Sequence, residues 1–181
     1  MVNYFLDLET SGLNPKTSQI LTIQFQELDR TTSEPIGELI ILKSWESSER
    51  EILTEFAKGF CKSNPFDFVA CGYNLKFEHD FLKVRGELYG LKFDLLSKPT
   101  IDIHPIGIMM NNGEFKGSGL DKMSGKVGDG FLVLEMYASK DYDGIIEYIK
   151  QEAREYLRLF VWLKTELPKL HKEYLIELGQ I

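Results

Sequence analysis

Two carboxylates two residues apart, Asp7 and Glu9, have the type and spacing to do chemistry. They interrupt an apolar run over residues 2–9, which has the composition of a β-strand and is followed by turn-forming residues 10–15. Because side chains alternate across a strand, both carboxylates point to one side and can converge on one cation. Like charges beside apolar neighbours are unfavourable unless a positive charge neutralises them. The pattern predicts a divalent-metal site, and the alternative is a solvated face of an edge strand.

Glu78 and Asp80 are further acidic candidates, and helical geometry separates them. At about 100° per residue, Asp80 falls on a stripe of alternating charge with Lys76 and Lys83, which is typical of a solvent-exposed face. Glu78 instead lies at the border of the apolar face. It is therefore the better candidate for a metal ligand, with Asp80 as the alternative.

Glu152 is the clearest candidate for a metal ligand in the C-terminal third of the chain. On the predicted helix it points into the middle of an apolar face that includes Ile149 and Tyr156, and Tyr148 lies one turn before it on the same side. A carboxylate inside an apolar stripe is costly unless it is paired or coordinates a cation. A metal ligand is the prediction, and a buried ion pair or a protonated glutamate is the alternative.

The elements that must position these side chains follow from periodicity and turn signals. The capping box Ser48–Glu51 opens a helix, and Gly90 ends another. The predicted strands cover residues 2–9, 19–28, 37–42, 66–72 and 99–103, and the predicted helices begin at residue 48, cover 77–89 and 143–166, and resume after Pro168. A Gly-rich connection around a short helix is expected over 111–130. This order predicts one domain over residues 1–181, an α/β sandwich with a mixed five-stranded sheet flanked by helices.

Composition narrows the class of protein. A length of 181 residues suits one domain with a substantial core, and a net charge of −7 argues against gripping nucleic acid through overall basicity. No apolar stretch approaches the roughly 20 residues that span a bilayer, and the first residues lack a signal-peptide pattern. Cys61 and Cys71 have no metal-binding or redox spacing, so both are expected to pack in the core. We therefore predict a cytoplasmic protein that does not engage a membrane.

Three segments together resemble the DEDD (DnaQ-like) 3′–5′ exonucleases, which have a ribonuclease H-like fold. Residues 4–13, YFLDLETSGL, are similar to the first family motif, and residues 72–78, GYNLKFE, are similar to the second. Residues 148–152, YIKQE, resemble the third motif of the tyrosine subclass, since position 148 is Tyr and position 147 is Glu rather than His. The second and third motifs carry Asp in the family where this chain has Glu78 and Glu152. The longer side chain keeps the charge but offers its carboxylate from a different position. Mg²⁺ demands near-ideal octahedral geometry, so this change can alter metal binding.

The resemblance implies a role for each matching residue. Asp7, Glu9, Glu78 and Glu152 would hold two divalent cations, Mg²⁺ or Mn²⁺, about 3.5–4 Å apart. Tyr148 would orient the attacking water or accept a hydrogen bond from it. The residues expected to contact or support the substrate are Thr10, Gly12, Leu13 and Asn74. Asp102 is expected to lie beside the site without taking a leading part.

The implied function is hydrolysis of phosphodiester bonds at single-stranded DNA or RNA 3′ ends. A catalytically weak or inactive relative that binds nucleic acid, or a polymerase or repair protein, is the alternative that the two glutamates motivate. A ribonuclease H-like endonuclease is a third possibility, although it would not need the Tyr-x-x-x-Glu helix. The sequence indicates neither an oligomeric state nor a preference between DNA and RNA.

Overall fold

A mixed sheet of five strands forms the centre of the protein. The computed structural model describes residues 1–60, 64–124 and 131–180. Cys61 and part of the Gly-rich stretch 111–130 therefore lie outside the described residues. In spatial order the strands are β3 (Pro35–Lys43), β2 (Ile20–Leu28), β1 (Asn3–Thr10), β4 (Val69–Gly72) and β5 (Thr100–Asp102).

The direction of pairing changes at β1. Strands β1, β2 and β3 pair antiparallel, whereas β1–β4 and β4–β5 pair parallel. The predicted meander and mixed five-stranded sheet are confirmed. Strand β1, which carries Asp7 and Glu9, is therefore the central strand, with two neighbours on either side, and the edge-strand alternative for this pair is wrong.

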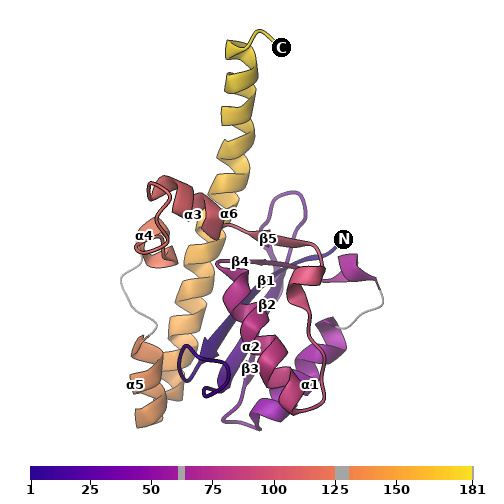
Figure 1. Ribbon diagram of the computed structural model, residues 1–181, viewed down its shortest axis with the longest axis vertical. Coiled ribbons are helices and arrows are strands. Elements are labelled where there is room, and N and C mark those ends of the chain that lie inside the picture. The colour runs from indigo at the N-terminus through magenta and orange to yellow at the C-terminus, as the bar shows by residue number, and fades with distance from the viewer. Residues whose placement is uncertain (61–63, 125–130, 181) are drawn as a thin grey trace.

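Helices cover both faces of the sheet (Figure 1). Helices α1 and α2 pack on one face, and the long helix α6 packs with α5 on the other. The helices are α1 (Glu49–Phe60), α2 (Leu75–Leu88), α3 (His104–Met110), α4 (Leu120–Ser124), α5 (Phe131–Ser139) and α6 (Tyr142–Glu177), with short 3₁₀ turns η1 (Pro65–Asp67) and η2 (Leu95–Ser97). The predicted three-layer α/β sandwich is confirmed.

Side chains along β1 alternate between the two faces of the sheet and contribute to the hydrophobic core on each face. Leu6 and Leu8 face α1 and α2, where they join an aromatic cluster that includes Phe56 and Phe81. Phe5 faces α6 and packs 5.1 Å from the ring of Tyr156. Asp7 and Glu9 share the parity of Phe5, so the strand directs both carboxylates toward α6.

Local chemistry explains where several elements begin. The Ser48 hydroxyl accepts from the Glu51 amide and donates to the Glu51 carboxylate, so the half of the predicted capping box in which Ser48 caps the helix is confirmed. Strand β4 begins later than predicted, at Val69, because Asn64 caps a 3₁₀ turn that contains Pro65. Cys71 is fully buried, as expected, and burial raises the pKa of its thiol to about 12.

The predicted break at Pro168 is wrong. Helix α6 runs through this residue as one element to Glu177, and its C-terminal part extends beyond the sheet (Figure 1). Proline removes one backbone donor, but the neighbouring Leu, Lys and Glu residues are strong helix formers and solvent surrounds most of this segment. Within the described ranges, no helix has the length and apolar character needed to cross a membrane.

Candidate metal centre

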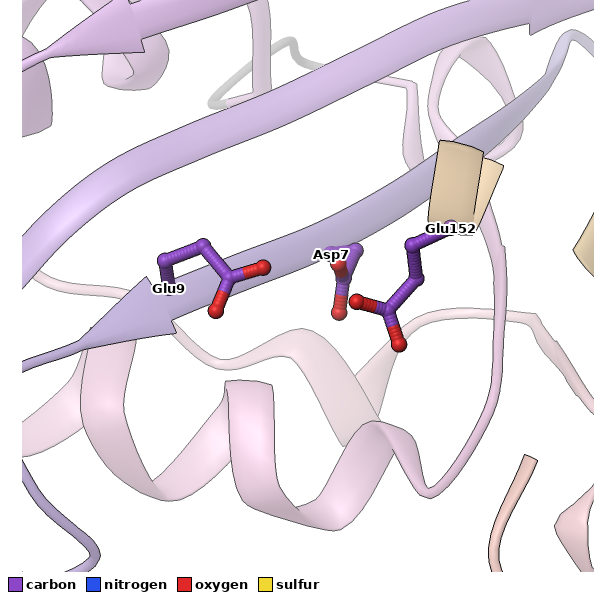
Figure 2. A group of neighbouring side chains, drawn as sticks. All are labelled: Asp7, Glu9 and Glu152. Atoms are coloured by element: carbon purple, nitrogen blue, oxygen red, sulfur yellow. The ribbon is translucent and has the colours of Figure 1, made fainter. Parts of the chain in front are cut away.

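Asp7, Glu9 and Glu152 converge on one point between β1 and α6. One carboxylate oxygen from each lies within 4.8 Å of the others, and Figure 2 shows the three groups turned toward a common space. Glu9 is buried, whereas Asp7 and Glu152 are half-buried. Three carboxylates this close repel one another unless a cation or protons neutralise them.

Helix α6 brings Glu152 and Tyr148 to the site together. The buried residues of α6 recur at helical spacing through Ile149, Ala153 and Tyr156, so Glu152 lies at the edge of the face that packs on the sheet and not in its middle as predicted. Burial raises the pKa of the Tyr148 phenol, and the Glu152 and Glu9 carboxylates and a hydrogen bond with Glu152 raise it further. Tyr148 is therefore a neutral phenol in contact with the acidic group.

Glu78 lies near enough to Asp7 and Glu152 for their charges to act on it, but it is not one of the three converging carboxylates. Only 3% of it is exposed, and its Oε2 has no hydrogen-bond partner among the residues that the structure describes. Burial raises the pKa of this carboxyl well above its usual value, and the charge of Asp7 raises it further. Of the described residues, the group within 4.8 Å contains Asp7, Glu9 and Glu152 and not Glu78. An orphaned buried carboxylate oxygen beside three others is a donor set that suits a hard divalent cation.

Asp80 does not take the place of Glu78. Its carboxylate accepts from the Lys76 ammonium at 2.6 Å on the outer face of α2, and both side chains are exposed. The helical-face argument therefore separates the two acidic residues correctly.

Asp102 fixes the start of α2. Its Oδ1 accepts hydrogen bonds from the backbone amides of Asn74 and His104, and its Oδ2 accepts one from the Leu75 amide. Asn74 adopts a left-handed conformation, with a φ of 64°, at the turn between β4 and α2. Asn74 therefore shapes the entry to the helix that carries Glu78, and Asp102 holds that entry in place.

Strand β1 ends at Thr10, directly after Glu9, and a loop follows it. The Thr10 hydroxyl donates to the Gly12 carbonyl at 2.8 Å, and a Cβ at Gly12 would lie 2.6 Å from the Ser18 hydroxyl oxygen. Leu13 is 75% exposed. The loop thus keeps Thr10 and Gly12 close together and presents an apolar side chain to solvent.

A pocket of about 470 Å³ opens beside Asp7 and Glu152. Aromatic rings of Tyr73, His104 and Phe115 line it, with Lys116 as a positive group. The Ser118 hydroxyl donates to the Phe115 carbonyl, so it accepts from His104 Nε2 at 2.8 Å. The Tyr73 hydroxyl donates to the Ser118 carbonyl. These contacts hold Phe115 and Ser118, which belong to the Gly-rich stretch 111–130, against the pocket.

Sequence reasoning missed two groups of residues at this site. The pocket aromatics come from three separate segments, so no spacing in the sequence connects them. Gln24 Nε2 donates to Asp7 Oδ2 at 2.7 Å from the neighbouring strand β2. The available signal was the alternation of Thr22, Gln24 and Gln26 along the predicted strand, which indicates a polar face, but the register that places Gln24 across from Asp7 is known only from the structure.

Comparison with solved structures gives the fold. Escherichia coli exonuclease I in complex with a dT13 oligonucleotide matches 97% of this chain at 12% identity, with a TM-score of 0.65. The fold is one that exonuclease I contains. Product-bound exonuclease I and the ExoI/SSB-Ct complex match 97% of the chain with TM-scores of 0.64 and 0.63, again at 12% identity. The chain covers only 43% to 46% of those three exonuclease I chains.

No protein-family model matches the sequence, and no curated protein matches it. The likeness to exonuclease I therefore shows the arrangement of sheet and helices. The chemistry must be argued from the residues of this chain.

Proposed function

We propose that this protein is a metal-dependent 3′–5′ exonuclease that hydrolyses phosphodiester bonds at single-stranded DNA or RNA 3′ ends. The observation that carries the proposal is the convergence of Asp7, Glu9 and Glu152 within 4.8 Å. The buried, unpartnered carboxylate oxygen of Glu78 nearby supports it. A fold that exonuclease I contains agrees with it.

In this proposal the four carboxylates hold two divalent cations, Mg²⁺ or Mn²⁺. Such ions, when bound, supply an acidified water as nucleophile and positive charge for the leaving oxygen. Asp7, Glu9 and Glu152 form the ligand set, and Glu78 adds its carboxylate from α2. The raised pKa of Tyr148 favours a role in which its neutral hydroxyl orients the water by hydrogen bonding.

The pocket beside the carboxylates offers a place for the end of the strand. Aromatic side chains stack on nucleobases of any sequence, and Lys116 can contact a phosphate. The exposed Leu13, together with Gly12 from the same loop and Thr10 at the end of β1, would contact the 3′-terminal nucleotide. A single-stranded end is the substrate that this arrangement favours.

A labelled single-stranded DNA or RNA oligonucleotide tests the proposal in Mg²⁺ and in Mn²⁺. We expect stepwise shortening from the 3′ end, lost in Asp7→Ala and retained in the matched control Asp80→Ala. A wild-type protein that leaves the 3′ end intact with both ions would contradict the proposal. Cuts in a circular oligonucleotide would instead indicate an endonuclease.

A binding module without strong turnover is the second candidate. The observation that favours it is the glutamate at positions 78 and 152, where the resembling family has aspartate. This candidate predicts that the protein binds an oligonucleotide, or a polymerase or repair protein, without degrading DNA or RNA. Glu78→Asp and Glu152→Asp together would then create or increase exonuclease activity.

A further inference from the structure

Two polar side chains on β2 are completely buried beside the acidic group. Thr22 and Gln24 are both 0% exposed in a strand whose other buried residues include Ile20, Leu21 and Ile23. A buried hydroxyl or amide costs free energy unless it is hydrogen-bonded. Both side chains therefore need hydrogen-bond partners inside the protein.

The strand register places this pair on the carboxylate face of the sheet. Gln24 is the direct cross-strand partner of Asp7, and Thr22 is the partner of Glu9. Directly opposed residues of antiparallel strands point to the same side. Thr22 and Gln24 therefore form a polar row alongside Asp7 and Glu9.

Hydrogen bonds in this row run in one direction. The Thr22 hydroxyl donates to Gln24 Oε1 at 2.9 Å, and Gln24 Nε2 donates to Asp7 Oδ2 at 2.7 Å. Because the Thr22 hydroxyl engages the carbonyl end of the amide, the amino end is the one that faces Asp7. The pair thereby fixes both the donor and its orientation.

A neutral donor has a specific advantage next to a cation ligand. A Lys or Arg at this position would form an ion pair with Asp7 and reduce its attraction for a metal ion. The Gln24 amide restrains the carboxylate through a hydrogen bond and leaves its negative charge in place. Groups that hydrogen-bond to metal ligands orient them and typically change metal affinity by 10- to 100-fold when removed.

We propose that Thr22 and Gln24 are positioning residues that hold the Asp7 carboxylate in the orientation that binds a divalent cation. Neither residue touches the reacting atoms, and Gln24 acts through Asp7 while Thr22 acts through Gln24. This inference rests on the metal site of the proposed function, but it concerns cation affinity and is independent of the substrate.

Binding of Mn²⁺ alone to the purified chain, measured by electron paramagnetic resonance, tests the inference. We expect Gln24→Met to weaken Mn²⁺ binding about 10- to 100-fold. Thr22→Val, which keeps the side-chain shape, should weaken it by a smaller factor because the amide remains but is free to turn. The matched control is Gln26→Met on the same strand, since Gln26 Nε2 donates to the Gly37 carbonyl.

The control separates positioning from general stability. Gln24→Met removes the two hydrogen bonds of its amide, with Thr22 and Asp7, and Gln26→Met removes the one with Gly37. The melting temperature without metal should therefore fall in both variants, whereas Mn²⁺ affinity should fall only in Gln24→Met. Equal Mn²⁺ affinity in wild type and Gln24→Met would overturn the inference, as would equal losses in both Met variants. Where Gln24→Met does not fold, wild-type affinity in Thr22→Val overturns it. A wild-type chain that does not bind Mn²⁺ would overturn the proposed function as well.

Discussion

A buried ion pair joins α1, α2 and β2, and its removal should destabilise the whole domain. The Glu49 carboxylate accepts two hydrogen bonds from Arg85, at 2.6 and 2.9 Å. It also accepts from the Tyr89 hydroxyl at 2.9 Å and from the Ile20 amide at 2.7 Å. The side chains of Glu49 and Arg85 are only 3% and 11% exposed. Glu49→Leu would leave a guanidinium, a hydroxyl and an amide without their acceptor.

The expected cost follows from the burial of Arg85. Removing one partner of a buried pair costs about 3–5 kcal/mol, because the remaining charge is uncompensated. Arg85 retains some contact with solvent, so we expect a loss of about 3 kcal/mol in the free energy of unfolding. For a chain of this size each kcal/mol lowers the melting temperature by roughly 2–4 °C, which gives a fall of about 6–12 °C.

Urea denaturation of Glu49→Leu, Arg85→Met and the double variant measures this coupling. We expect the double variant to be more stable than the sum of the single losses predicts, since it buries no lone charge. The matched control is Glu55→Gln, which breaks the exposed pair with Lys58 on the same helix and should change stability by about 0.5 kcal/mol or less. A loss in Glu49→Leu no larger than in this control, or strict additivity in the cycle, would refute the reasoning.

Two further variants test the surroundings of the site. Because burial raises the pKa of Glu78 above its usual 4.5, the folded chain keeps a proton that the unfolded chain releases, and stability without metal should fall as pH rises from about 4.5 toward the raised pKa. Glu78→Gln should remove this part of the slope in urea titrations at several pH values in EDTA, and an unchanged slope would contradict the assignment. Asp102→Ala removes the acceptor of three backbone amides and should cost about 2 kcal/mol in urea denaturation. Asp94→Ala, at a 3₁₀ turn without a side-chain cap, is its control, and equal losses in the two would argue against the capping role.

Residues whose position depends on one element could be predicted from the sequence. The alternation of β1 puts Asp7 and Glu9 on one face, and helical geometry separates Glu78 from the exposed Asp80. The degree of burial was predicted less well, because Glu78 was expected at the border of an apolar face and is buried, whereas Glu152 was expected in the middle of one and is half-buried. The sheet and its two helical layers followed from the same periodicities. Each of these predictions needs only the repeat of a single strand or helix.

Residues whose position or contacts depend on several elements could not be predicted in the same way. The distance from Glu78 to the three converging carboxylates is set by the packing of α2 on the sheet. Asp102 was correctly expected near the site, but its bonds to the start of α2 join residues far apart in the chain. Helix α5 was missed because its sequence, FLVLEMYAS, is apolar nearly throughout and has little helical periodicity.

The three converging carboxylates come from segments far apart in the sequence, with Asp7 and Glu9 on β1 and Glu152 on α6. Contacts between such distant segments form late in folding, because the chain must first lose the entropy of closing a long loop. A partly folded chain with only the β1–β2–β3 meander would present Asp7 and Glu9 without their third partner. A cation held by all three carboxylates would thus stabilise only the completed domain, by about 2.7 kcal/mol at a concentration 100 times its dissociation constant. Metal binding would therefore report on folding of the entire domain and would protect finished molecules from proteolysis in preference to incomplete ones.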